Sequence, residues 1–154
     1  MNLLDHFVLQ HVQVSLLKAR LIHVSKEAGA QKAKVELNLT PRVLDTDSTE
    51  SLPSYQVSAL LSCKGGAENE SDPKFVAQVG LEVIYRQIDG EPVDITRFTR
   101  NHASLTRQLY PLLQQEMRML LVRLGLEQIQ LPFDLAARVS LPEGELVQIS
   151  GSVH

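Results

Sequence analysis

Alternation of apolar and polar residues is the clearest pattern in the first half of the chain. It is regular in three stretches, 33–40, 55–63 and 75–85, where every second residue is apolar. A period of two places those apolar side chains on one face of a strand. The pattern therefore predicts three half-buried antiparallel strands, with Cys63 pointing inward.

An earlier run, 7–24, is rich in β-branched and other apolar residues but does not alternate cleanly. Phe7 and Leu17 share one parity, whereas Val8 and Val14 share the other. A change of parity within one strand indicates a β-bulge or partial burial on both faces. We therefore expect a first strand that is irregular.

The stretch 101–135 carries the only long helical pattern. Apolar residues at steps of three and four form one stripe that would face the core, namely Leu105, Leu109, Leu113, Met117, Leu120 and Leu124. A second apolar set lies off that stripe and consists of Leu112, Met119, Leu121 and Val122. The helix would thus be buried on two sides, either in a thick core or, as we prefer, against another copy of the chain.

The ends of this helix are also signalled. Asp94 or Thr96 would cap its start, and Gly125 would end it, since a residue without Cβ adopts the left-handed conformation at low cost. Pro111 removes a backbone donor, so the helix is expected to kink or to split near this residue. Beyond the helix, Asp134 would cap a short helical turn, and 145–150 would be a final strand or a frayed tail.

Strands first and helices second predict the α+β class. The expected architecture is a four-stranded antiparallel sheet followed by a long kinked helix and a shorter C-terminal element. Two polar connections, 40–53 and 64–73, interrupt the sheet. Since no repeat or linker divides the chain, residues 1–154 are expected to form a single domain.

Composition and charge narrow the class of function. The formal net charge is −3, and the arginines are dispersed, which argues against nucleic acid as a partner. The lone cysteine cannot form an intramolecular disulfide and fits a reducing compartment. No apolar stretch approaches the roughly 20 residues needed to span a bilayer. We expect a cytoplasmic protein without membrane insertion.

Residues that usually carry catalysis or bind metals do not converge. No two of the five histidines have the i, i+4 spacing of a helical metal site, and neither acidic run, 45–50 or 68–72, has an EF-hand pattern. Cys63 is interpreted as a buried structural thiol, and His102 and Ser104 lie where caps are common. We therefore expect no enzymatic activity, no metal site and no cofactor.

Short segments along nearly the whole chain occur in a distinctive order. They are FVLQHVQV, VELNL, YQVSALLS and KFVAQVGLEVIY, followed by a run from Tyr110-Pro111 through the helix to Leu131-Pro132-Phe133-Asp134. This order resembles the SecB family of protein-export chaperones. The Tyr-Pro that enters the helix and the Leu-Pro-Phe-Asp that follows it are the most distinctive parts.

The resemblance implies a homotetramer, assembled through the long helices, that binds unfolded or non-native polypeptides. It would act as an ATP-independent holdase in protein export, with no catalytic residue. Clients of the family lie in apolar grooves between the crossover loop and the loop after the main helix. The matching positions are Leu44, Leu52, Tyr55, Leu131, Phe133 and Leu135. The expected oligomer interface consists of Leu113, Met117, Leu120, Leu121 and Leu124.

Some positions depart from the family pattern. Members that deliver clients to the SecA motor use acidic residues where this chain has Leu16, Arg20 and Gln78, which puts docking to SecA in doubt. Pro142 and Gly144 interrupt the matching C-terminal helix. A divergent relative that serves other clients, such as antitoxins, is one alternative. A non-catalytic oligomeric adaptor or structural module that binds one folded partner is the other.

Overall fold

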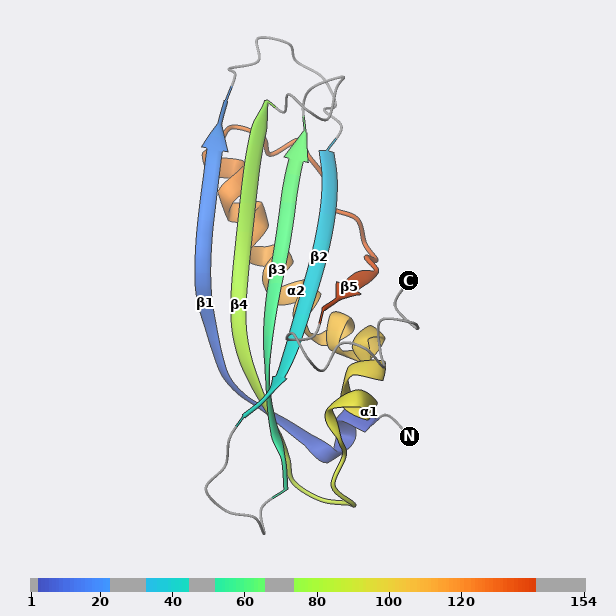
Figure 1. Ribbon diagram of the computed structural model, residues 1–154. Helices are drawn as coiled ribbons and strands as arrows, with labels where there is room; N and C mark the ends of the chain where they lie inside the picture. Colours follow the sequence, from blue (N-terminus) through green and yellow to red (C-terminus); the bar gives the residue numbers. More distant parts are fainter. Residues whose placement is uncertain (1–2, 23–32, 45–51, 66–73, 141–154) are drawn as a thin grey trace.

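The computed structural model describes residues 3–22, 33–44, 52–65 and 74–140. In chain order they form η1 (Leu3–His6), β1 (Phe7–Leu21), β2 (Ala33–Val43), β3 (Ser54–Gly65), β4 (Phe75–Gln87), α1 (Ile95–Arg100), α2 (His102–Arg123) and β5 (Ala137–Val139). Figure 1 shows the sheet as one layer, with α2 crossing behind it. The predicted α+β class and the four predicted strands are confirmed.

The sheet has five strands, in the order β1-β4-β3-β2-β5. Neighbouring strands among the first four are antiparallel, whereas β5 runs parallel to β2. The prediction of a purely antiparallel, four-stranded sheet is therefore corrected, because the segment after Asp134 adds a short strand instead of a helical turn. This strand satisfies backbone groups along β2, and Ser140 N–H donates to the carbonyl of Leu39 at 2.9 Å. The stretch 145–150 lies outside the described residues.

β1 is an irregular edge strand, as its mixed parity predicted. Its pairing with β4 shifts between Gln10 and Gln13 and again between Val14 and Leu16. His11, inside the first shift, has a φ of 50°. Each shift changes which side chains of β1 face the core. Apolar residues of β1 therefore emerge on both faces of the sheet.

The inner face of the sheet and one side of α2 form the core. The predicted helix stripe is fully buried through its first four members, Leu105, Leu109, Leu113 and Met117. Beyond them Leu121 is buried, whereas Leu120 and Leu124 are half-buried beside the core. Steps of four residues turn the buried line slowly around the helix, which suits packing against a twisted sheet.

Helical structure begins before the predicted stretch. Asp94 caps α1, and its carboxylate accepts from Arg97 N–H at 2.8 Å. Asn101 then separates α1 from α2, and its side-chain amide donates to the carbonyl of Arg97 at 3.2 Å. Because α2 continues through Pro111 without a break, the split predicted near this proline lies at Asn101 instead. Gly125, with a φ of 75°, follows the end of α2 as predicted.

Crossing a lipid bilayer requires a helix of about 20 mainly apolar residues. No helix within residues 3–22, 33–44, 52–65 and 74–140 is both long enough and apolar enough to do so.

Candidate functional site

A groove of about 650 Å³ lies between α2 and the segment that leads into β5. We call it the helix groove. One wall is formed by residues on the N-terminal part of α2, namely His102, Ala103, Thr106, Arg107, Tyr110, Pro111 and Gln114. The other wall is the segment 133–137, which contributes Phe133, Asp134, Leu135, Ala136 and Ala137.

The wall on α2 follows from helical periodicity. Residues 103, 107, 110 and 114 recur at steps of three and four, beside the stripe that enters the core. Pro111 adds a backbone feature to this wall. A proline has no N–H, so the carbonyl of Arg107 lacks its usual helical donor.

Tyr110 ties the two walls together. Its hydroxyl donates a hydrogen bond to the carbonyl of Pro132 at 2.6 Å. Burial raises the pKa of Tyr110, although the nearby Arg118 acts in the opposite direction. The hydroxyl therefore stays protonated at neutral pH and keeps its role as a donor.

The predicted peptide-binding residues after α2 have different exposures. Phe133 is 92% exposed, whereas Leu135 is half-buried and Leu131 is buried. Phe133 and Leu135 line the helix groove, and Leu131 anchors the segment in the core. The free energy falls when another apolar group covers an aromatic side chain with that much exposed surface.

The predicted residues before and in β3 do not line this groove. Leu44 and Leu52 are half-buried, and Leu44 N–H donates to the carbonyl of Ser54 at 3.0 Å. Tyr55 is 2% exposed and packs against Phe98 in a tilted arrangement, with 4.6 Å between ring centroids. Leu44, Leu52 and Tyr55 therefore lie outside the lining of the helix groove.

The hydroxyl of Tyr55 is also occupied inside the core. It donates to the carbonyl of Val93, next to the α1 cap. Burial, with a smaller contribution from Asp94, raises the pKa of Tyr55 to about 12. Tyr55 thus joins β3 to the turn before α1.

The predicted oligomer-interface residues divide into two groups. Leu113, Met117 and Leu121 are buried in the core of the single chain, and Leu120 and Leu124 are half-buried at its margin. The large apolar side chains exposed on α2 are Leu112, Met119 and Val122, with 37%, 50% and 58% of their surface exposed. Three of the four residues off the predicted stripe thus form the second apolar side of the helix.

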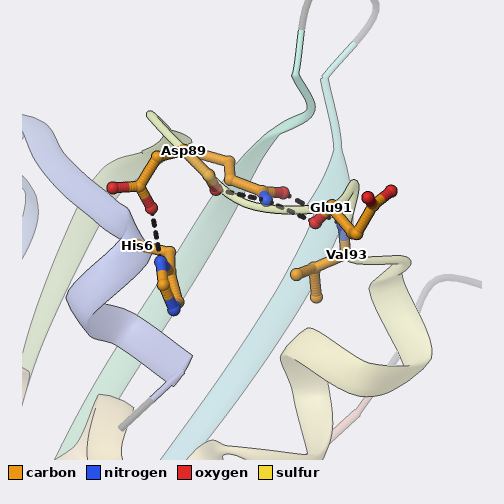
Figure 2. Close-up of polar contacts among 5 residues, drawn as sticks. His6, Asp89, Glu91 and Val93 are labelled. Carbon is orange, nitrogen blue, oxygen red and sulfur yellow. Dashed lines mark hydrogen bonds and ion pairs between the residues drawn. The ribbon is translucent and has the colours of Figure 1, made fainter. Parts of the chain in front are cut away.

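A second cavity, of about 540 Å³, lies where β4 turns toward α1. Figure 2 shows its polar contacts, including the pair formed by His6 and Asp89. The side-chain amide of buried Gln87 donates to the carbonyls of Asp89 and Glu91 at 2.8 and 2.6 Å and accepts from Val93 N–H at 3.0 Å. These polar groups hold the turn in place, so we regard the cavity as part of the scaffold.

Titratable groups with perturbed pKa values lie in or near the core. Burial raises the pKa of the Cys63 thiol to about 11 and also raises the pKa of Tyr85. Among the described residues, no three His, Cys, Asp or Glu side chains are close enough together to hold a metal ion.

Comparisons with known proteins bear on the fold. No protein-family model matches the sequence, and no curated protein matches it. A solved structure of the Mycobacterium tuberculosis SecB-like chaperone Rv1957, in complex with a ChAD peptide from the Rv1956 HigA1 antitoxin, is 16% identical to this chain. The two structures have a TM-score of 0.63, over 86% of this chain and 93% of that chain. This chain has a SecB-like fold.

The SecB-like fold is the one that the order of sequence segments predicted.

A second solved structure, of a protein of unknown function from Streptococcus agalactiae, is 13% identical to this chain. Its TM-score is 0.37, over 82% of this chain and 97% of that chain.

Several groove residues on α2 were missed by reasoning from the sequence. They are His102, Ala103, Thr106, Arg107 and Gln114. Their spacing on one side of α2 is visible in the sequence, but it resembles an ordinary solvated side of a helix. Only the return of the chain toward β5, within the SecB-like fold, turns that side into the wall of a groove.

Proposed function

We propose that this protein is a chaperone that binds non-native polypeptides in the helix groove, without ATP and without catalysis. The main support is the exposure of Phe133. This side chain is 92% exposed, and it lines a groove that is bordered by β5 at the edge of the sheet. Covering an apolar side chain of this size contributes roughly 1.5–3 kcal/mol. This free energy depends little on the direction of approach, which suits sequence-tolerant binding.

The backbone around the groove suits an extended client. β5 pairs only with β2 among the described strands, so its other edge can receive an additional strand. The carbonyl of Arg107, left without its helical donor by Pro111, offers a further acceptor. Hydrogen bonds to the backbone would hold any sequence, while the apolar walls would favour apolar side chains.

The client is proposed to be an unfolded or non-native segment of another protein. The Mycobacterium tuberculosis neighbour was solved with a peptide from an antitoxin, which supports a polypeptide as the ligand. Antitoxin segments and proteins destined for export are both candidate clients. Phe133 is proposed as the main peptide contact, with half-buried Leu135, Leu44 and Leu52 as further contacts. Tyr55 and Leu131 are buried, so their proposed role is to support this surface from the core.

We also propose that the working form is a homo-oligomer in the cytoplasm, with a tetramer as the expected state. Val14 and Leu17 pair with core positions of β4, yet 44% and 53% of their surfaces are exposed. Met119 and Val122 are exposed on α2, whose C-terminal part lies behind β1 and β4 in Figure 1. Apolar residues on the side of the sheet that faces the helices are normally covered, and a second copy would cover them.

The proposal is tested by suppression of aggregation. Three unrelated, chemically denatured proteins are diluted into buffer with and without a near-stoichiometric amount of this protein, and light scattering is followed. We expect suppression for all three and weaker suppression by Phe133→Ala. Ile88→Ala is the matched control, because Ile88 is 51% exposed and lies outside the groove.

Two outcomes would count against this function. Absence of suppression for every client would exclude a general holdase. Binding of one folded partner, unaffected by Phe133→Ala, would favour the adaptor alternative, for which the exposed apolar side of α2 is the natural surface.

A further inference from the structure

The face of the sheet opposite α2 is basic, although the chain as a whole is acidic. This outer face is turned toward the viewer in Figure 1. Strand pairing places six exposed cations of β1 to β4 on it, namely Lys18, Arg20, Lys34, Arg42, Lys64 and Arg86. Exposed Arg138 of β5 pairs with Asn38 and adds a seventh. The formal net charge of the whole chain is −3.

Only two carboxylates lie on the outer face within the described strands, and both have partners. Glu36 forms ion pairs with Lys34 at 3.4 Å and Arg138 at 3.8 Å. Glu82 accepts hydrogen bonds from Gln56 at 2.8 Å and Ser58 at 2.5 Å. Within the described part of the chain, Lys18, Arg20, Lys64 and Arg86 therefore have no ion pair.

Lys18, Arg20 and Lys64, which have no ion pair among the described residues, lie at one end of the outer face. Arg20, Val76, Lys64 and Lys34 occupy one row across β1, β4, β3 and β2. Strands about 4.8 Å apart make such a row roughly 14 Å wide. Lys18 lies in the next row, beside Gln78. Like charges gathered in this way favour a partner of opposite sign.

The middle of the outer face is less charged. Leu16, Gly80 and Leu60 follow one another across β1, β4 and β3, and Leu16 is 38% exposed. An apolar centre within a charged rim is the usual anatomy of a protein–protein interface. The described residues place no aromatic side chain on this face, whereas surfaces for single-stranded nucleic acid usually stack bases on aromatic rings.

We propose that the outer face, centred on Lys18, Arg20 and Lys64, docks an acidic segment of a partner protein that also carries apolar residues. The surface is separate from the helix groove, which lies on the other layer of the fold. One molecule could therefore hold a client in the groove and contact an acidic partner through the sheet. Binding of this kind would be driven largely by charge and would weaken with salt.

The test uses the full chain and a fluorescein-labelled peptide of alternating Glu and Leu, with fluorescence anisotropy as the readout. We expect binding in 50 mM NaCl, and weakening by about tenfold for the variant Lys18→Glu/Arg20→Glu. The matched control is Arg118→Glu/Arg123→Glu, which makes the same change of charge on exposed sites of α2 outside the helix groove. This control is expected to bind the peptide like the unaltered protein.

Each other outcome would overturn the proposal. Loss of binding only in the Arg118→Glu/Arg123→Glu variant would place the peptide on α2, and equal loss in both variants would indicate a general effect of net charge. Equal binding of a peptide with Lys in place of Glu would exclude charge complementarity. Tighter binding of a 20-nucleotide dT oligonucleotide at the same residues would identify a nucleic-acid surface instead. Suppression of client aggregation by the Lys18→Glu/Arg20→Glu variant is measured separately, because that assay reports on the helix groove and not on the outer face.

Discussion

Tyr110 illustrates how one hydroxyl can position a binding surface. Its hydrogen bond to Pro132 joins the helix to the segment that carries Phe133. Tyr85 makes a comparable bond, to the side chain of Gln108 at 2.7 Å, but neither of these two residues lines the groove. The two tyrosines therefore form a natural pair for comparison.

Replacing Tyr110 by Phe should lower the free energy of unfolding by about 1 kcal/mol, because the Pro132 carbonyl loses a partly buried donor. Tyr85→Phe should have a similar cost in urea denaturation. Only Tyr110→Phe should accelerate amide exchange in 131–135 and weaken suppression of client aggregation. Equal effects of both variants on the clients would show that Tyr110 does not position the groove.

A buried thiol and a buried phenol make the free energy of unfolding sensitive to alkaline pH. Burial raises the pKa of Cys63 from 9.0 to about 11, and burial together with Asp94 raises the pKa of Tyr55 from 10.0 to about 12. At a pH between the ordinary and the raised pKa of each group, the unfolded chain binds fewer protons than the folded chain. The free energy of unfolding should therefore fall as pH rises from about 9 to about 12.

Urea denaturation at several pH values measures this slope. One such group contributes at most about 1.4 kcal/mol per pH unit. The double variant Cys63→Ala/Tyr55→Phe should be less stable at pH 7 but should show a shallower fall above pH 9. A slope identical to that of the unaltered chain would mean that other groups govern alkaline unfolding.

At the scale of elements, β1 and β4 meet closely at the bulge. A Cβ added to Gly80 would lie 2.9 Å from Ser15 Oγ and 3.1 Å from Leu16 Cβ. These contacts are too short to be accommodated without a shift. The irregular run of apolar residues in β1 and the glycine in β4 are thus parts of one arrangement, since the bulge brings β1 toward a residue that has no side chain.

Gly80→Ala should destabilise the protein by about 1–3 kcal/mol, as expected for overpacking. The same substitution in a Ser15→Ala background should cost less, because the shortest contact disappears while the contact with Leu16 remains. Chemical denaturation of the four chains in a double-mutant cycle gives the coupling. A coupling of zero would mean that the bulge accommodates a methyl group elsewhere.

At the scale of the whole molecule, the exposed apolar residues of β1 and α2 predict self-association. Leu17→Lys/Met119→Lys should shift the protein toward monomer, because both charges would be desolvated in the assembly. Multi-angle light scattering after size exclusion measures the mass, with Ile88→Lys as an exposed control at the turn after β4. A monomer for the unaltered chain would exclude the proposed assembly.

The sequence by itself determined the features that depend on local periodicity. Alternation located three strands and turned Cys63 inward, and the apolar run 7–24 of mixed parity located the irregular first strand. Asp94 and Gly125 marked where helical structure begins and ends. The order of short segments indicated the SecB-like fold. These features follow from neighbouring residues, whose side chains are directed by the period of the backbone.

Only the tertiary structure decided which distant segments meet. It paired β5 with β2, moved Tyr55 into the core and brought Phe133 next to α2. It also gathered cations from separate strands on one face of the sheet. Such contacts depend on register and on the path of the chain between elements, and no local pattern encodes either. The proposed surfaces for a client and for an acidic partner are therefore products of the fold.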